Sequence, residues 1–179
     1  MPQTSRALLQ LSLHPVTAAD EHFLRQLYRE VRDPELIPLG WPSVQVAAFC
    51  DMQYNFRAAN HGQYQPPVIS SLVRVEGVAV GRVDIVHGPG EWTLVNVELL
   101  TAWRDRGLGR QLLETLQRQA AQAGVAILLT VEVASRAAAV YRRCGFISMQ
   151  SDGFLERMVW SPHSASHTAR SCTDDGSCV

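Results

Sequence analysis

The spacing of apolar residues changes along the chain, and each spacing predicts a different element. Leu8 to His14 alternate weakly, as in a strand, and are followed by an amphipathic helical pattern from about Ala18 to Val31. Thr17 to Asp20 resembles a capping box, which would start this helix. Proline lacks the backbone N–H that a helix needs, so we expect Asp33-Pro34 to break the pattern. Ser43 to Ala59 then predicts a second helix.

The middle of the chain reads as antiparallel strands. Val68 to Val75 and Val78 to Val86 are rich in β-branched residues and flank Glu76-Gly77, a pair typical of a tight hairpin turn. A second turn, His87 to Gly90, leads into a third strand from Glu91 to Thr101. These three segments predict a β-meander.

A strong helical pattern follows, with apolar residues at a 3.6-residue period from Leu108 to Ala123 and Gly124 at the position of a C-cap. Val125 to Val133 is almost continuously apolar, as in a strand covered on both faces. Ser135 is a suitable cap for a short helix that reaches Cys144. The chain then predicts a last hairpin formed by Phe146 to Gln150 and Phe154 to Trp160. This order of elements indicates an α+β domain.

Composition narrows the class of protein. The 179 residues suit one domain, which we place at residues 1–160, and the polar residues 161–179 predict a disordered tail. With 16 Lys and Arg against 17 Asp and Glu, the chain has no excess charge for binding nucleic acid or an anionic membrane. No apolar stretch approaches the ~20 residues of a membrane span, and no secretory signal is evident. We therefore expect a cytoplasmic protein.

The cysteines and tail histidines do not predict a metal site. Without a secretory signal, Cys50, Cys144, Cys172 and Cys178 are expected to be free thiols. His163, His167, Cys172 and Cys178 have loose metal-ligand spacing, but the tail lacks the paired C-x-x-C of a zinc scaffold. We expect no metal.

The segment from Arg104 to Gly109 carries the chemistry. It lies between a predicted strand and a helix start, where backbone N–H groups have no partner within the helix and can bind phosphate. Gly107 and Gly109 leave the backbone open to a pyrophosphate, and Arg104, Arg106 and Arg110 add positive charge. The spacing fits neither a P-loop nor a dinucleotide fingerprint. An ordinary glycine-containing loop with solvated arginines is the alternative.

The six residues Arg104 to Gly109 resemble the [Q/R]-x-x-G-x-[G/A] signature of the GNAT superfamily of N-acetyltransferases, in the same strand, turn and helix order. Tyr141 to Phe146 also resembles that family's second cofactor region, although Ser135 stands where many members have asparagine. The resemblance covers about Val68 to Trp160. It implies a mixed, mostly antiparallel central sheet flanked by helices, and acetyl-CoA as the acyl donor.

The resemblance also implies the residues that hold the donor. The pantetheine arm would lie between two splayed strands, Val95 to Thr101 and Ile127 to Val133, and backbone N–H groups near Leu99 would stabilise the oxyanion of the reaction. The residues expected to contact the donor are Leu99, Leu100, Thr101, Arg104, Asp105, Arg106, Gly107, Leu108, Gly109, Arg110 and Ser135.

Two side chains are candidates for proton transfer. Tyr141 would act as general acid toward the departing CoA thiolate, with core packing as the alternative. Glu98 would act as general base toward the amine, with a surface salt bridge as the alternative. Glu132, on the neighbouring strand, is a second candidate base.

The resemblance predicts an N-acetyltransferase that transfers acetyl directly to an amine in a ternary complex. The acceptor is a small molecule or a peptide, and Tyr28, Trp41 and Tyr54 are candidates for its pocket, with core packing as the alternative for each. A non-catalytic acyl-CoA-binding module on the same fold, and an interaction protein that recruits a partner through its tail, are the rival functions. A homodimer is kept open as the assembly.

Overall fold

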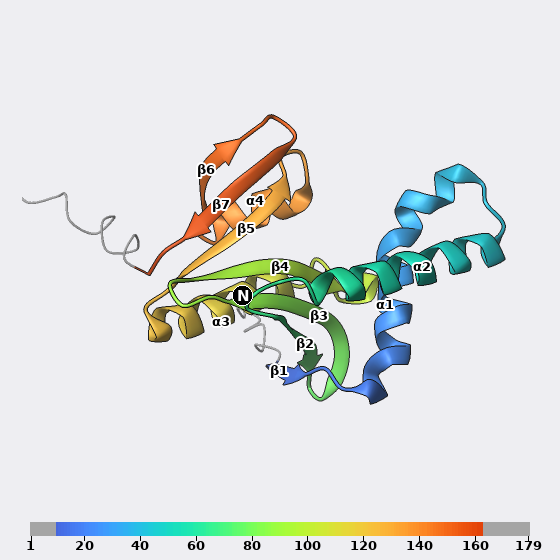
Figure 1. Ribbon diagram of the computed structural model, residues 1–179, viewed down its shortest axis with the longest axis horizontal. Helices are drawn as coiled ribbons and strands as arrows, with labels where there is room; N and C mark the ends of the chain where they lie inside the picture. Colours follow the sequence, from blue (N-terminus) through green and yellow to red (C-terminus); the bar gives the residue numbers. More distant parts are fainter. Residues whose placement is uncertain (1–9, 163–179) are drawn as a thin grey trace, which may run out of the picture.

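The computed structural model describes residues 10–162 and is built around one seven-stranded sheet (Figure 1). The strand order is β1-β2-β3-β4-β5-β7-β6, and every neighbouring pair is antiparallel except β4 and β5. The predicted mixed, mostly antiparallel sheet is therefore confirmed. The strands are β1 Leu11–Pro15, β2 Val68–Val75, β3 Val78–His87, β4 Glu91–Leu99, β5 Ala126–Glu132, β6 Ile147–Ser151 and β7 Leu155–Trp160.

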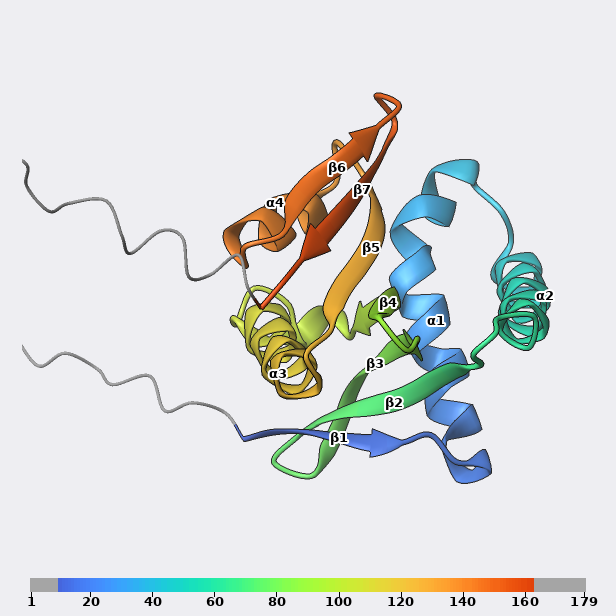
Figure 2. The same cartoon turned by 60° about the vertical axis from the view of Figure 1, so that its left-hand side comes forward.

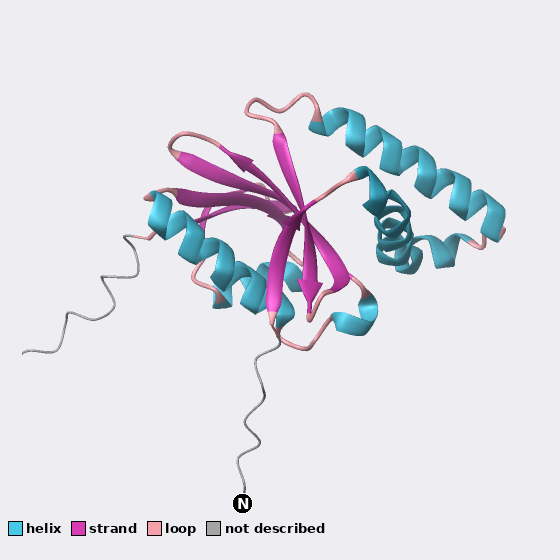
Figure 3. Ribbon diagram, turned by 90° about the horizontal axis from the view of Figure 1, so that it is seen from below, coloured by secondary structure: helices cyan, strands magenta, loops and turns pink. Residues whose placement is uncertain are grey.

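Helices cover both faces of the sheet. Figure 2 shows α3 and α4 on one side and α1 and α2 on the other, and Figure 3 shows the same separation from below. The helices are α1 Glu21–Leu36, α2 Ser43–His61, α3 Leu108–Ala123 and α4 Arg136–Arg143. Short 3-10 turns, Ala18–Asp20, Ile37–Leu39 and Thr101–Trp103, precede or follow them. The sheet thus separates a layer formed by α3 and α4 from a layer formed by α1 and α2.

The main core lies between α3 and the sheet. Leu112 and Leu116 of α3 are fully buried against Val73, Val83 and Met158 of the strands. A smaller cluster on the opposite face joins α1 and α2 to β2, with Leu24, Tyr28, Cys50, Tyr54 and Leu72 as members. Because side chains alternate along a strand, Val73 and Val75 of β2 enter the main core while Leu72 enters the smaller cluster on the opposite face.

The first helix corrects the prediction that Asp33-Pro34 would end it, because α1 continues through Pro34 to Leu36. Pro34 lies in the last turn of the helix, where it removes one hydrogen bond, to the carbonyl of Glu30, and leaves the earlier turns intact. Leu36 is buried, and its packing offsets this loss. The capping box is present, since the Asp20 carboxylate accepts hydrogen bonds from the backbone N–H and the hydroxyl of Thr17.

The other predicted elements agree with the structure to within about three residues at their ends. Both residues of the hairpin turn have left-handed backbones, with φ 51° at Glu76 and φ 82° at Gly77. Glycine adopts this conformation without strain. Ser135 caps α4, because its hydroxyl accepts a hydrogen bond from the N–H of Ala138 at 3.2 Å. Cys50 and Cys144 are free thiols.

The parallel pair β4 and β5 separates after three residue pairs. Glu91, Trp92 and Thr93 pair with Ala126, Ile127 and Leu128, and no pairing follows in the described chain. A bulge adds to the divergence, since Asp84 of β3 pairs with Asn96 and Ile85 with Leu94, which leaves Val95 as an extra residue in β4. In Figure 1 the two strands meet at one end and move apart toward the other. The backbone from Leu94 to Leu99 is therefore unpaired on its β5 side.

Among residues 10–162, no helix is long and apolar enough to cross a membrane. The tail expected at residues 161–179, with the loose set His163, His167, Cys172 and Cys178, lies almost wholly outside the described residues.

Candidate active site

The turn before α3 presents backbone donors. Asp105 and Gly107 have positive φ angles of 58° and 84°, which bend the chain sharply out of the 3-10 turn. The first intrahelical bond runs from the N–H of Gln111 to the carbonyl of Gly107 at 3.0 Å. The preceding N–H groups, those of Leu108, Gly109 and Arg110, come before that bond and have no partner of this kind. Such a helix start attracts anions.

The glycines of this turn leave space for a ligand. A Cβ atom built on Gly109 would meet no heavy atom within 4 Å, so protein packing does not require glycine there. Gly107 is different, because its left-handed φ disfavours any side chain. The open space at Gly109 leaves the backbone accessible, as a pyrophosphate site at this turn would require.

Each arginine of the turn has a partner within the protein. Arg104 Nε donates to the carbonyl of Leu99 at 2.9 Å, and the guanidinium of Arg106 lies 5.3 Å from the centre of the Trp103 ring. Arg110 Nε donates to Glu114 at 2.7 Å, while Arg136 pairs with Asp105 at 2.9 Å. Arg104 thus ties the turn to the end of β4. The positive charge expected near the phosphates is present but is partly neutralised.

Two of the backbone groups predicted to contact the donor already have protein partners. The N–H of Leu100 donates to the carbonyl of Val80 at 2.9 Å, and the N–H of Thr101 donates to the carboxylate of Glu30 at 2.6 Å. Leu99 pairs with Gly81 on the β3 side, and its side chain packs on the main core. The structure therefore leaves the open edge of β4, rather than the N–H groups of Leu100 and Thr101, for pairing with a ligand.

Tyr141 lies in α4, partly buried beside the main core. Its ring packs edge-on against Phe146 with the ring centres 5.6 Å apart. Burial, with a smaller contribution from Cys144, raises the pKa of Tyr141 to about 12. The phenol is therefore protonated throughout the neutral range, and its hydroxyl makes no hydrogen bond within residues 10–162. Both the proton and its freedom to be donated suit a general acid.

Glu98 forms a buried ion pair. Its side chain accepts a hydrogen bond from Arg57 Nη1 of α2 at 2.5 Å, and only 4% of the Glu98 side chain is exposed. The other carboxylate oxygen, Oε2, has no hydrogen-bond partner among the described residues. The salt bridge named as the alternative is therefore present, but it is buried between α2 and β4 and does not lie on the surface. Glu98 keeps one free acceptor atom.

Glu132 and Ser135 lie at the end of β5 and just after it. Glu132 is exposed on the half of β5 that is not paired with β4, and it pairs with Leu155 of the neighbouring strand β7. Ser135 uses its hydroxyl to cap α4, so its side chain has a local role that the sequence also predicted. Neither residue lines the pocket that lies between the α1–α2 pair and β4.

A pocket of about 330 Å³ lies between the α1–α2 pair and β4. On the β4 side the pocket is lined by Val95 and Asn96, which lie in the half of the strand that is no longer paired with β5. Of the three aromatic residues predicted to line an acceptor pocket, only Tyr28 does so. The pocket is lined by Tyr28, Arg32, Gln53, Phe56, Arg57, Asn60, His61, Tyr64, Val95 and Asn96.

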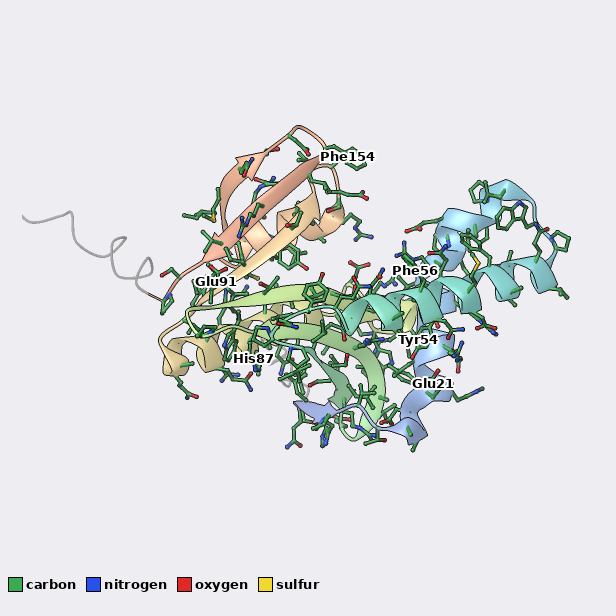
Figure 4. The ribbon with its side chains drawn as sticks, in the orientation of Figure 1. Glu21, Tyr54, Phe56, His87, Glu91 and Phe154 are labelled. Carbon is green, nitrogen blue, oxygen red and sulfur yellow. The ribbon has the colours of Figure 1, made fainter. Side chains whose placement is uncertain are left out.

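The other two predicted aromatics pack within the helical layer. Tyr54 donates a hydrogen bond to Glu21 of α1 at 3.1 Å, and Figure 4 shows these two residues together, away from Phe56. Trp41 packs edge-on against Phe49 with ring centres 5.4 Å apart. Core packing, the alternative, describes Tyr54, which is buried in the smaller cluster, whereas Trp41 is partly buried against Phe49 outside both clusters.

A polar cluster beneath the pocket was not predicted. Arg82 is buried and donates from Nε to fully buried Asp84 at 2.6 Å and from Nη2 to Ser70 at 3.0 Å. Asn96 donates to the second oxygen of Asp84 at 3.4 Å, and Arg82 Nη2 lies 3.4 Å from Nδ1 of His61. The cluster connects the sheet to the pocket wall at Asn96 and His61.

The sequence contains one signal that points to the pocket. Gln53, Arg57 and Asn60 follow a spacing of four and three residues, which places them on one face of α2. A polar stripe on a helix with few buried residues is typical of a ligand-facing surface as well as of a solvated one. Periodicity alone does not separate these two cases.

Solved structures of acetyltransferases share this fold. The PaiA N-acetyltransferase of Thermoplasma acidophilum, solved in complex with coenzyme A, superposes with a TM-score of 0.64 at 13% identity, over 86% of this chain and 99% of that one. An acetyltransferase from Thermus thermophilus gives 0.61 at 24% identity, over 86% and 97%. A spermidine N-acetyltransferase chimera from Vibrio cholerae and hSSAT gives 0.60 at 17%, over 88% and 99%.

A search of curated proteins finds no match to the sequence. The model of the acetyltransferase (GNAT) family, in contrast, matches residues 24–146, which is more than half of the chain. This range includes most of α1 and all of α2, the meander, the turn before α3, α3 and α4. The protein is thus an acyltransferase, as its sequence predicted, and the chain belongs to the GNAT family of acetyltransferases.

Proposed function

We propose that this protein transfers the acetyl group of acetyl-CoA directly to an amine, with donor and acceptor bound together. The separation of β4 and β5 beside the N-terminus of α3 is the observation that carries the proposal. It leaves an unpaired strand edge next to a turn of free N–H groups, the two features that an extended chain ending in a pyrophosphate requires.

The donor site uses backbone groups more than charge. The N–H groups of Leu108, Gly109 and Arg110 would bind the pyrophosphate, and the open space at Gly109 allows its close approach. The free edge of β4 from Leu94 to Leu99 would pair with the amides of the pantetheine arm as a strand does. Acetyl-CoA supplies the acyl group as a thioester. Ser135 and the three arginines of the turn would then act mainly by holding the backbone.

The chain's own residues would move two protons. The amine must lose a proton as its nitrogen bonds to the acyl carbon, and Glu98 Oε2 is a buried acceptor without a partner in the described chain. The departing thiolate must gain a proton, and Tyr141 carries one at all neutral pH values. N–H groups on the free edge of β4 would stabilise the oxyanion between these two steps. Glu132 remains a second candidate base.

The binding step can be tested without knowledge of the acceptor. A ligand at 100 times its dissociation constant adds about 2.7 kcal/mol to the stability of the folded protein. For a chain of this size, that corresponds to a rise in Tm of about 5–10 °C. Saturating acetyl-CoA, CoA and desulfo-CoA should each produce such a rise, and the absence of a shift with all three would contradict the proposed donor site.

Turnover distinguishes an enzyme from the alternative, a non-catalytic acyl-CoA-binding module. The Glu98–Arg57 ion pair favours that alternative, because the guanidinium already occupies one oxygen of the candidate base. A screen of amine classes, read by release of free CoA thiol, decides between them. Binding with no turnover in any class would favour the module, and turnover above the rate of donor hydrolysis would support the enzyme.

A further inference from the structure

The pocket beside β4 is lined by cations and hydrogen-bond donors. Two of its side chains, Arg32 and Arg57, are cationic, and no carboxylate is among its lining residues. The carboxylates nearest to these arginines, Glu35 and Glu98, are hydrogen-bonded to them from outside the pocket. A lining of this kind disfavours an ammonium-rich ligand and favours an anion.

Arg57 is fixed with one edge of its guanidinium unused. Its Nη1 is held by Glu98 at 2.5 Å, and its Cζ lies 4.6 Å from the centre of the Tyr28 ring and 5.7 Å from that of Tyr54. Its Nη2 has no hydrogen-bond partner within residues 10–162. A guanidinium that is oriented in advance loses little entropy on binding, and its natural partner is a carboxylate.

His61 adds a further donor. Arg82 only donates, so the Nδ1 atom of His61, 3.4 Å from Arg82 Nη2, is the acceptor and the ring proton lies on Nε2. Burial lowers the pKa of His61, which favours this neutral form. The imidazole is therefore not a free base at Nδ1.

From these contacts we propose that the pocket binds a carboxylate of the acceptor, so that the acceptor is a small amino-acid-like molecule with both an amine and a carboxylate. Arg57 Nη2 would donate to the carboxylate, with Arg32 adding charge. Glu98, which does not line the pocket, would hold the Arg57 guanidinium in place through its ion pair. The carboxylate site follows from the pocket, and the amine follows from the proposed reaction. This inference rests on the proposed acetyl transfer.

The size and position of the pocket agree with a small acceptor. A volume of about 330 Å³ is at the lower end of the range for ligand sites, which suits a single amino acid better than a folded partner. Val95 and Asn96 place the pocket beside the half of β4 that is no longer paired with β5. Tyr28, Phe56 and Tyr64 supply aromatic walls for an apolar side chain.

The experiment compares acceptors that differ in one group. Phenylalanine, phenylalaninamide and phenethylamine share the ring and the amine, and only the first carries a carboxylate; spermidine represents the polyamines. We expect the kcat/KM of phenylalanine to exceed that of each other acceptor by at least about tenfold, a typical effect of one charged hydrogen bond. Equal values, or a preference for the amide or for spermidine, would overturn the inference.

Variants assign the preference to the pocket. Arg57→Gln and Arg32→Gln should reduce the advantage of phenylalanine over its amide, with the larger effect at Arg57. Arg118→Gln, an exposed arginine of α3 bonded to Thr115, is the matched control and should keep the full advantage. If Arg57→Gln fails to fold, Arg57→Lys keeps the charge but loses the fork and should show an intermediate preference. A preference that survives in all folded pocket variants would contradict the assignment.

A binding measurement separates this inference from the proposed function. Calorimetric titration of N-acetylphenylalanine and of its amide into the CoA-saturated protein requires no turnover. Tighter binding of the carboxylate, lost in Arg57→Gln, would support the pocket, and equal binding would overturn it. Failure of acetyl-CoA to raise the Tm would instead contradict the donor site, while a normal rise with turnover of spermidine alone would leave acetyl transfer intact and overturn only the carboxylate pocket.

Discussion

The carboxylate of Glu30 in α1 accepts a hydrogen bond from the backbone N–H of Thr101 at 2.6 Å, across 71 residues of the chain. Thr101 begins the 3-10 turn that leads into the predicted donor site, whereas α1 forms one wall of the pocket. One side chain therefore connects the two halves of the proposed active site. Because the bond is charge-assisted and satisfies an N–H at the end of a strand, it should contribute to stability.

The variant Glu30→Ala should lower the Tm by about 2–4 °C, which corresponds to about 1 kcal/mol at this chain length. Glu30→Gln keeps an acceptor oxygen in the same place and should lose less than half of that. Thermal unfolding of both variants at neutral pH provides the measurement. An alanine variant as stable as the wild type would show that the contact has no energetic role.

Tyr141→Phe should preserve acetyl-CoA affinity and lower turnover by a factor of about 10² to 10⁴, the usual contribution of a general acid. The substitution keeps the ring that packs on Phe146 and removes only the hydroxyl. Steady-state kinetics with the best acceptor and a CoA titration test the two parts. Unchanged turnover would assign Tyr141 to packing alone.

Tyr141 also predicts a dependence of stability on alkaline pH. The folded pKa of about 12 lies above the ordinary value of 10.0, so the folded protein binds the phenolic proton more tightly than the unfolded chain. The stabilising contribution of this proton is therefore complete below about pH 9 and is lost as the pH rises toward 12, by an amount on the order of 2 kcal/mol. Tyr141→Phe lacks this loss. Urea unfolding of both proteins at several pH values between 8 and 11 should show the wild type weakening relative to the variant only above pH 9 or so.

Gly81→Ala should destabilise the sheet beneath Glu98. A Cβ atom at Gly81 would overlap the carbonyl oxygen of Glu98 and lie 2.6 Å from Cδ2 of Leu99. Overpacking of this kind typically costs about 1–3 kcal/mol, and the backbone of β4 must move to relieve it. Gly90→Ala is the control, since its Cβ would meet nothing within 4 Å. Equal stability of the two variants, measured by urea unfolding, would contradict the close approach of β3 and β4.

Gly109→Glu should separate binding from folding. The added side chain has open space, and glutamate is favourable in the first turn of a helix, so the fold should remain. Repulsion between its charge and a phosphate at about 4 Å is on the order of 1–4 kcal/mol, which weakens CoA binding at least severalfold. Gly109→Gln has the same size without the charge and should bind CoA more tightly than the glutamate variant. Wild-type affinity for CoA in a folded Gly109→Glu protein would place the donor site elsewhere.

Local patterns predicted most of the fold, because the information they need lies within a few residues. The helix from Leu108 to Ala123 and the strand from Val68 to Val75 have the predicted bounds. The helix through Pro34 could not be predicted in this way, since its last turn depends on the tertiary burial of Leu36. Local rules give the cost of proline but not the packing that offsets it.

The side chains of the candidate site were harder to predict than its turn. The turn before α3 is one continuous segment with a recognisable spacing of glycines. The Arg57–Glu98 pair, in contrast, joins residues 41 positions apart, and Glu98 could equally have been a surface residue. Only the packing of α2 over β4 decides that Glu98 is buried and that Arg57 lies against Tyr28. Long-range pairs of this kind do not appear in the periodicity of either element.

The early separation of β4 from β5 gives this protein a strand edge in the middle of its sheet. An exposed edge at the border of a sheet invites pairing with strands of other molecules and hence aggregation. Here the amides of Leu94 to Leu99 that point away from β3 face a gap between two strands of the same sheet, which is closed at one end by the pairs from Glu91 to Thr93. A second protein would have to insert a strand between them, whereas a thin, flexible molecule with a few amide groups can enter from the open end. The same backbone atoms are thereby shielded from other chains and available to a ligand.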